Sequence, residues 1–413
     1  MRTTGRVTVL LMLMTAPVLT GTGTATAETP VSPVSLTGRG QCTYPAKPIK
    51  GTPWSLQRVM LDQLWQDTKG RRPDGRPVRV AVIDTGVDVT NPQLKDAVDT
   101  RSGADLLSRP EDPDKGPTAD VVGHGTKVAG IIAARPQPET GFVGLAPESV
   151  IIPVRQNDEK GTGTSKTLAQ GIAKAVADGA DVINISQDTT KPLSPDSDLE
   201  LAVKDALAKD VVVIASAGND GTDGSVKETY PAAYKGVLAV GASDRNNERA
   251  VFSQAGDFIG VAAPGVEMVS TVPKGGQCAD DGTSFSAPYV AGVAALIRAK
   301  HPDWKQYQVV AQIEQTAERA VNGRDRYIGW GVVDPVRALT DDGHPIDAVT
   351  LPKGPAHDVH PPTPARLALG ETPEQRQERL ATYALGGAAV LVAAITGVAV
   401  VVRDHRRRRR PAA

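Results

Sequence analysis

Short apolar runs alternate with stretches of helical periodicity through the middle of this chain of 413 residues. The runs are rich in Val, Ile and Ala and predict buried strands at residues 78–83, 150–154, 182–185, 211–215 and 237–240. Apolar residues recur at helical spacing over residues 125–134, 167–177, 199–208, 287–300 and 304–316. Near-continuous apolar strands that alternate with helices are typical of a mostly parallel sheet with helices on both faces. We therefore expect an α/β fold whose ligand site lies beyond the carboxyl ends of the strands.

The first residues predict a secretory signal peptide, residues 1–27. Arg2 and Arg6 precede a short apolar core, and a small-residue cleavage sequence ends at Ala27. A retained membrane anchor is the alternative, but the apolar core is short for a spanning helix. We therefore expect cleavage and export.

The other end of the chain predicts a membrane anchor. Residues 383–402 are uncharged and long enough to cross a bilayer. The tail that follows, residues 403–413, is rich in arginine, and the positive-inside rule puts it in the cytoplasm and the main domain outside. An arginine run would also suit a nucleic-acid contact, but beside a spanning segment the topology signal is the simpler interpretation. We expect a single-pass protein of the cell membrane with no nucleic-acid partner.

Two polar, proline-rich segments flank the alternating region. Residues 28–53 predict an extended N-terminal extension. Residues 54–340 form the predicted folded domain, which opens with apolar residues at roughly helical spacing over residues 54–65. Residues 341–382 lose this periodicity and predict a stalk and juxtamembrane segment with solvated histidines. The formal net charge of −1 indicates no dedicated polyanion partner.

Ser284 stands where a Gly-rich loop runs into an apolar, helix-like segment. There the unpaired backbone N–H groups and the dipole of a helix favour developing negative charge, which suits a nucleophile. A serine before a helix is more often only an N-cap. Two further motifs decide between these alternatives: Asp84-Thr85-Gly86 directly after the strand at residues 78–83, and His124-Gly125-Thr126 at the start of an apolar helix.

In chain order, D-T-G, H-G-T and G-T-S resemble the three motifs of subtilisin-like serine proteases, and this order is that of subtilisin. The resemblance implies a catalytic triad in a subtilisin-like fold. Ser284 would be the nucleophile, His124 the general base and acid, and Asp84 the group that orients the imidazole. A lone histidine is more often structural, but the only other histidine between residues 54 and 340 is His301, in a His-Pro-Asp-Trp turn.

Asn219 lies in Ser-Ala-Gly-Asn-Asp, which resembles the subtilase segment whose Asn side chain donates to the oxyanion. The backbone N–H of the nucleophile would be the second donor. A Gly-Asn-Asp-Gly sequence also predicts a turn, and the two interpretations are compatible. The neighbouring Gly218 is an expected substrate-binding residue.

Residues 182–186 resemble the edge segment of the family that pairs with an extended substrate backbone, so Ser186 is also an expected substrate-binding residue. Family members usually follow this serine with a small or apolar residue and a glycine, whereas Gln187 and Asp188 stand here. This departure leaves the shape of the first specificity pocket open. Asp188 and Asp220 would together favour a basic side chain before the cut, unless both acids are simply solvated.

Cys42 and Cys278 are the only cysteines. In an exported protein two cysteines most simply form one disulfide, with two free thiols as the alternative; the bond would brace the extension near Ser284. Neither cysteine has metal-type spacing with a histidine, so we expect no metal site from these residues and no cofactor. Many subtilases bind a structural calcium ion, but no acidic cluster identifies ligands for one here.

The layout of the whole chain resembles the mycosins, the membrane-anchored subtilases of type VII secretion systems in actinobacteria. Secreted subtilases usually carry a folded pro-domain where residues 28–53 stand, and this extension is too short to be one. The resemblance implies hydrolysis of secreted protein or peptide substrates outside the membrane, in association with a type VII secretion membrane complex. Two alternatives remain: a scaffold that stabilises such a complex, with proteolysis secondary, and a general degradative protease. The complete set of catalytic motifs favours activity over a pure scaffold.

Overall fold

The computed structural model describes residues 33–35, 42–107, 116–191, 193–351 and 373–408. The chain divides into two compact units, Met1–Leu351 and Pro352–Ala413, each of which is described by itself. The predicted signal peptide lies outside the described residues, as do residues 352–372 of the predicted stalk and juxtamembrane segment.

The first unit is built on a seven-stranded sheet in the order β3-β4-β2-β6-β7-β8-β9, in which all neighbouring strands are parallel. The strands are β2 (Arg79–Asp84), β3 (Ala104–Asp105), β4 (Val150–Arg155), β6 (Val182–Ile185), β7 (Val212–Ser216), β8 (Leu238–Ser243) and β9 (Ile259–Pro264). The expected α/β fold with a mostly parallel sheet is confirmed.

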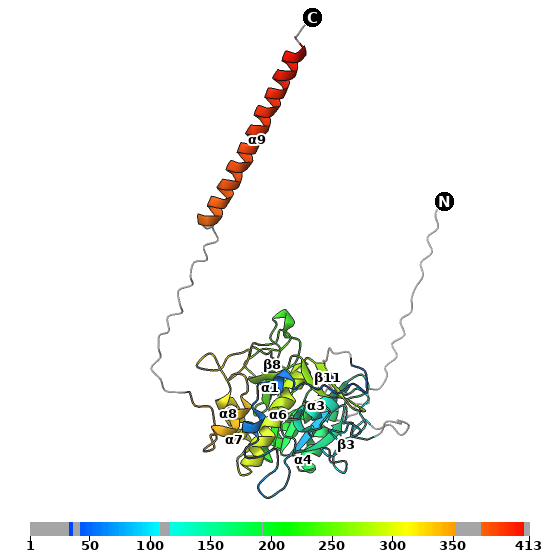
Figure 1. Cartoon of the computed structure of the whole chain (residues 1–413). Helices are drawn as coiled ribbons and strands as arrows, with labels where there is room; N and C mark the ends of the chain where they lie inside the picture. The colour runs from blue at the N-terminus through cyan, green and yellow to red at the C-terminus, as the bar shows by residue number, and fades with distance from the viewer. Residues whose placement is uncertain (1–32, 36–41, 108–115, 192, 352–372, 409–413) are drawn as a thin grey trace, which may run out of the picture. The chain divides into compact units, whose positions relative to one another are not determined.

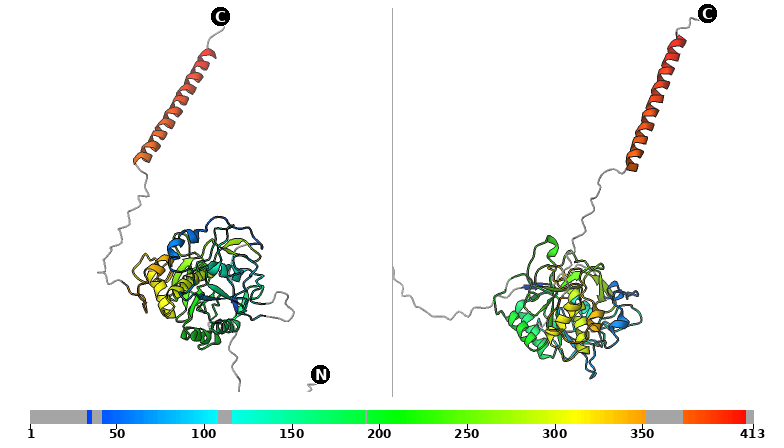
Figure 2. Two further views of the ribbon diagram at one scale, coloured as in Figure 1. Left: turned by 60° about the horizontal axis from the view of Figure 1, so that its bottom comes forward. Right: turned by 90° about the vertical axis from the view of Figure 1, so that its left-hand side faces the viewer.

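Helices cover both faces of this sheet. Because successive side chains of a strand point to opposite faces, β2 divides its residues between two cores. Val80 and Val82 belong to the core that includes α3 (His124–Ala133), α6 (Thr283–Lys300) and α7 (Gln306–Thr316), and Figure 1 shows α3 and α6 beside each other. Ala81 and Ile83 belong to the core with α4 (Ser165–Ala177) and α5 (Asp198–Ala208), the green helices that lie side by side in Figure 2.

Several short elements complete the first unit. The helical stretch expected over residues 54–65 is two short helices, α1 (Trp54–Gln57) and α2 (Leu61–Leu64). Two antiparallel pairs stand apart from the main sheet: β1 (Pro33–Ser35) with β5 (Thr162–Thr164), and β10 (Met268–Thr271) with β11 (Gln277–Asp280). The remaining elements are a 3₁₀ turn, η1 (Gly221–Asp223), and α8 (Pro335–Thr340).

Residues 341–351, expected to begin the stalk, belong to the first unit. Gln308 of α7 donates to the Asp347 carboxylate at 2.8 Å, and the Thr350 backbone N–H donates to the Gln315 side chain at 2.7 Å. These polar contacts hold a segment that has no apolar periodicity, which is why the sequence pattern ended at 340.

The second unit contains one long helix, α9 (Pro373–Arg408). It includes the predicted span at residues 383–402 and continues into the charged residues on both sides. An 18-residue window of this helix has a mean hydropathy of 2.5. The helix is therefore long enough and apolar enough to cross a membrane. The helix therefore fits a single-pass membrane anchor.

Candidate active site

Asp84 and His124 form a buried hydrogen-bonded pair. Asp84 is the last residue of β2, and His124 is the first residue of α3. The His124 Nδ1 atom lies 2.8 Å from Asp84 Oδ1 and 3.0 Å from Oδ2, and the side chains are 7% and 1% exposed. An ionised carboxylate can only accept hydrogen bonds, so Nδ1 donates and Nε2 keeps a lone pair. The pair thus presents Nε2 as a proton acceptor.

Ser284 is the second residue of α6. We expected this helix to begin at residue 287, but it begins at Thr283, so the serine lies in the first turn, where backbone N–H groups have no helical acceptors. Pro288 has no N–H to bond the Ser284 carbonyl. That carbonyl instead accepts from the Ser186 hydroxyl at 2.8 Å, which connects the serine to the end of β6.

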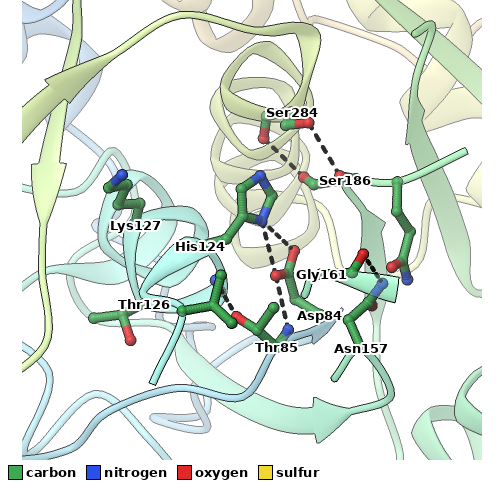
Figure 3. A network of polar contacts seen from close by, with 12 residues as sticks. Asp84, Thr85, His124, Thr126, Lys127, Asn157, Gly161, Ser186 and Ser284 are labelled. Atoms are coloured by element: carbon green, nitrogen blue, oxygen red, sulfur yellow. Dashed lines mark hydrogen bonds and ion pairs between the residues drawn. The ribbon is translucent and has the colours of Figure 1, made fainter. Parts of the chain in front are cut away.

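The Ser284 hydroxyl donates to the backbone carbonyl of Ser186 at 3.1 Å rather than to His124. Within the described part of the chain, His124 Nε2 is buried and has no hydrogen-bond partner. Figure 3 shows Ser284 on the side of the imidazole ring that faces away from Asp84. A rotation about the Ser284 Cα–Cβ bond is therefore needed to bring the hydroxyl to Nε2, and such hydrogen bonds often tighten only when substrate binds.

Asn219 and Gly218 follow β7 and lie against Thr283. The Asn219 Oδ1 atom accepts from the Thr283 backbone N–H at 2.9 Å and from its hydroxyl at 3.0 Å. With its amide oxygen held there, Asn219 presents its N–H groups on the opposite side of the side chain. The Gly218 N–H donates to the Thr283 hydroxyl at 3.2 Å. Gly218 has a φ of +98°, a backbone conformation that favours glycine, and a Cβ there would lie 2.9 Å from Asp188 Oδ2.

Asp120 is a residue of the site that sequence reasoning missed. Its buried carboxylate accepts from the backbone N–H groups of Gly123 (2.7 Å) and Thr126 (2.8 Å), at the start of α3. It also accepts from the hydroxyls of Thr126 and Thr85. Burial raises the pKa of Asp120, and these hydrogen bonds oppose that rise. Asp120 stands three residues before the N-cap Gly123, so the ordinary N-cap pattern does not identify it from the sequence.

Asp188 lies against Gly218 and has a perturbed acidity. Burial, and secondarily the charge of Asp220, raise the pKa of Asp188 to about 7. The two acids predicted to favour a basic side chain are therefore close enough to interact, beside the expected oxyanion donor.

One expectation about substrate binding is wrong. Residues 182–186 were expected to form an edge segment, but residues 182–185 form β6, which lies in the interior of the sheet, paired with β2 on one side and β7 on the other. An interior strand has no unpaired main-chain groups to offer a peptide. The chain leaves the sheet only at Ser186, whose buried side chain bonds to Ser284 and Asn184.

A buried ion pair connects the helix of His124 to the segment before Ser284. Lys127 Nζ lies 2.8 Å from Asp280 Oδ2, with side chains 7% and 4% exposed. The Lys127 ammonium also lies over the Phe285 ring, 5.9 Å from its centroid, and that ring is 5.4 Å from the His124 ring. The Lys127–Asp280 pair and the Phe285 ring therefore pack together next to the His124 imidazole.

The predicted disulfide between Cys42 and Cys278 is confirmed, with the two Cα atoms 6.3 Å apart. Tyr44, two residues further on, donates its hydroxyl to the Val122 carbonyl at 2.8 Å. Burial, followed by the charges of Asp120 and Asp280, raises the pKa of Tyr44 to about 12. The extension is thus attached both near the Ser284 loop and beside the start of α3.

Among the residues that the structure describes, no group of three or more His, Cys, Asp or Glu side chains is placed to hold a metal ion. The site described above brings together a buried acid, an imidazole, a hydroxyl and an amide.

The model of the subtilase family (Peptidase_S8) matches residues 75–331. The fold and the site define a subtilisin-like serine endopeptidase, and the chain belongs to the subtilase family. The chain is 38% identical to the M-protease of Shouchella clausii (strain KSM-K16) over 285 residues, 69% of each chain. It is 37% identical to Subtilisin Savinase of Lederbergia lenta over 285 residues, which cover 69% of this chain and 97% of that one.

Two solved structures connect the chain to the mycosins. The MycP3 protease from the type VII (ESX-3) secretion system is 33% identical with a TM-score of 0.64, covering 76% of this chain and 95% of that chain. MycP1 with its N-terminal propeptide removed is 32% identical with a TM-score of 0.60, covering 70% and 98%. The protein is thus a subtilase most like the mycosins.

Proposed function

We propose that this protein is a membrane-anchored serine endopeptidase that cleaves secreted proteins or peptides outside the cytoplasmic membrane. The observation that carries the proposal is the buried Asp84–His124 pair: its Nε2 atom has no hydrogen-bond partner among the described residues and faces Ser284 at the first turn of a helix. A buried imidazole in this position is suited to act as a general base.

In the proposed reaction, Ser284 Oγ attacks the carbonyl carbon of the scissile bond while His124 Nε2 takes its proton. The Asp84 carboxylate stabilises the resulting imidazolium. The Asn219 amide and the Ser284 backbone N–H bind the oxyanion, helped by the positive end of the α6 dipole. When the C–N bond breaks, His124 gives its proton to the leaving amine. A water deprotonated by His124 then hydrolyses the acyl-enzyme, and the proton returns to Ser284.

The cellular setting is inferred from the likeness to MycP3, described as part of a type VII secretion system. We place this protein in a type VII secretion membrane complex, with α9 as its anchor. The arginine-rich tail favours a cytoplasmic C-terminus and an extracellular peptidase unit. A structural calcium ion stays a prediction, which a melting curve with and without EGTA would check.

The direct test is labelling of the full-length protein in detergent with a fluorophosphonate serine probe, beside Ser284→Ala and His124→Ala variants. We expect labelling of the wild type only. If a folded wild-type protein is not labelled, the site does not assemble and the protease proposal fails. Secretion restored in cells by Ser284→Ala would support the scaffold function instead.

A further inference from the structure

A charged cleft of about 510 Å³ lies at the edge of the main sheet that is opposite to the candidate active site. Asp84 is the last residue of β2, so the triad lies at the carboxyl ends of the strands, whereas this cleft is formed by residues that precede β2 and β4 and by one that follows α3. Because α3 has ten residues and starts at His124, about 15 Å separate its two ends. The charged side chains that line the cleft are those of Lys69, Arg71, Asp96, Arg135 and Glu148.

Arg135 has a donor group that the protein leaves without an acceptor. Its Nη2 atom donates to the backbone carbonyl of Asp96 at 3.0 Å. Its Nη1 atom is buried and has no hydrogen-bond partner among the described residues. A buried donor without an acceptor is unfavourable, most of all on a charged group. An anionic oxygen bound in the cleft would give this N–H group an acceptor.

Arg71 and Arg135 are close enough for their like charges to repel each other. Burial, and secondarily the charge of Arg71, lower the pKa of Arg135, whereas the charges of Asp96 and Glu148 oppose this change. The cleft therefore holds two guanidinium groups together, and a bound anion would offset the repulsion between them.

The cations that line the cleft are only weakly neutralised by the protein. Arg71 Nε lies 3.7 Å from Glu148 Oε2, too far for a hydrogen bond, and both side chains are almost half exposed, so this ion pair is weak. Within the part of the chain that the structure describes, no carboxylate lies within ion-pair distance of the Lys69 ammonium. Arg76, in the same turn but outside the cleft lining, is instead paired with Asp74 at 2.7 Å.

The main chain around the cleft is held by hydrogen bonds. The Glu148 backbone N–H donates to the Lys69 carbonyl at 2.7 Å, which joins the segments before β2 and β4. The Arg135 backbone N–H donates to the Gln93 carbonyl at 2.8 Å, and the Gln93 side chain donates back to the Arg135 carbonyl at 2.9 Å. Because these main-chain positions are already ordered, a ligand would bind without the cost of ordering the backbone.

We propose that this cleft binds a phosphate group, free or carried by a lipid head group, between the guanidinium groups of Arg71 and Arg135 and the ammonium group of Lys69. Guanidinium groups bind phosphate oxygens through paired N–H donors, and lysine adds a point charge. Three cations around one ligand suit a phosphate, which has more oxygens and can carry more charge than a carboxylate. The site lies apart from the triad and does not depend on the proposed protease function.

The first experiment removes one cation at a time. The full-length protein, in a phosphate-free neutral detergent at constant ionic strength, is titrated with inorganic phosphate in a calorimeter. We expect Arg71→Gln and Arg135→Gln each to weaken binding about tenfold, because each loses charge-assisted hydrogen bonds. Arg76→Gln is the matched control, with the same loss of charge outside the cleft lining, and should bind like the wild type. Equal affinity in all four proteins, or no binding by the wild type, would overturn the inference.

The second experiment looks for tighter binding, which a misfolded variant could not produce. Glu148→Gln removes the carboxylate that competes for Arg71 and repels an anion. We expect this variant to bind inorganic phosphate about threefold more tightly, the scale of a weak surface ion pair. Asp74→Asn is the matched control, because Asp74 is paired with Arg76 outside the cleft lining. Unchanged or weaker binding by Glu148→Gln would contradict the inference.

The same titration with other anions identifies the source of the phosphate. Glycerophosphoglycerol is an anionic phosphodiester head group without acyl chains, and its binding as tightly as inorganic phosphate would support a lipid head group. Binding of inorganic phosphate alone would support free phosphate. Acetate that binds as tightly as either would overturn the assignment to a phosphate group. Ser284→Ala should bind phosphate like the wild type, so this result is independent of whether the triad is active.

Discussion

Asp120 illustrates, at the scale of single residues, how the site depends on a group that takes no part in the chemistry. Its carboxylate collects hydrogen bonds from the turn before α3 and from Thr85, next to Asp84. In Asp120→Asn, one acceptor oxygen becomes an NH₂ group that faces these donors. Buried donors left without acceptors cost about 1–3 kcal/mol. We expect a lower Tm by calorimetry and slower fluorophosphonate labelling, because the start of α3 shifts.

Glu248→Gln is a matched control, because Glu248 is exposed and lies on the loop after β8. Its Tm and labelling rate should equal those of the wild type. An Asp120→Asn protein that melts and labels like this control would show that the Asp120 network does not position His124.

We expect Asp188 to make substrate preference depend on pH. Its pKa is raised to about 7, first by burial and then by Asp220, so the carboxyl is neutral below that pH and charged above it. A basic side chain bound beside Gly218 would gain an ionic partner only when Asp188 is ionised. We expect the ratio of kcat/KM for a Lys substrate to that for a Leu substrate, with the residue placed before the cut, to rise as pH increases through about 7.

Two variants test this assignment. Asp188→Asn should abolish the pH dependence of the ratio, and Asp220→Asn should move the transition to lower pH, since the charge that helps to raise the Asp188 pKa is gone. A transition that persists unchanged in Asp188→Asn belongs to another group, and Asp188 would then not set the preference.

At the scale of elements, the Lys127–Asp280 pair connects α3 to the end of β11, just before α6. Removal of one partner from a buried pair leaves an uncompensated charge, at a cost of about 3–5 kcal/mol. We expect Lys127→Met to be severely destabilised in urea unfolding. The double variant Lys127→Met with Asp280→Leu should recover much of the loss. If the loss of unfolding free energy in the double variant equals the sum of the losses in the two single variants, the two side chains are not energetically coupled.

The main elements could be predicted from the sequence because burial leaves a pattern. The strand at residues 182–185 matches β6 in both bounds, and α4 and α5 begin within two residues of the expected positions. The position of β6 within the sheet was wrong, since an apolar run does not distinguish an interior strand from an edge strand. Thr162–Thr164 and Pro33–Ser35 pair with each other but have no apolar pattern in the sequence that would mark them as strands.

The candidate site also has parts that the sequence predicts and parts that only the structure reveals. Asp84, His124 and Ser284 stand in recognisable motifs because their chemistry requires those side chains, and the structure brings them to one place. The Ser284 carbonyl accepts a hydrogen bond from the Ser186 hydroxyl because Pro288 has no backbone N–H to donate to it within the helix. That consequence was present in the sequence but becomes visible only when β6 and α6 are seen to meet.

At the scale of the whole molecule, the Cys42–Cys278 bond joins residues 236 positions apart. In Cys42→Ser with Cys278→Ser, the unfolded chain gains freedom, and we expect a stability loss of about 2–4 kcal/mol by denaturant unfolding. An unchanged stability would mean that the bond does not brace the fold.

The topology of the anchor can be tested with single cysteines, since both native cysteines are bonded to each other. His405→Cys lies in the basic segment at the end of α9, and Ala348→Cys lies on the exposed segment before the stalk. The positive-inside rule predicts that arginines near residue 405 stay in the cytoplasm. In intact cells, a membrane-impermeant maleimide should therefore label Ala348→Cys and not His405→Cys, and permeabilisation should expose both. Labelling of His405→Cys in intact cells would reverse the orientation, and the peptidase unit would then face the cytoplasm, away from secreted substrates.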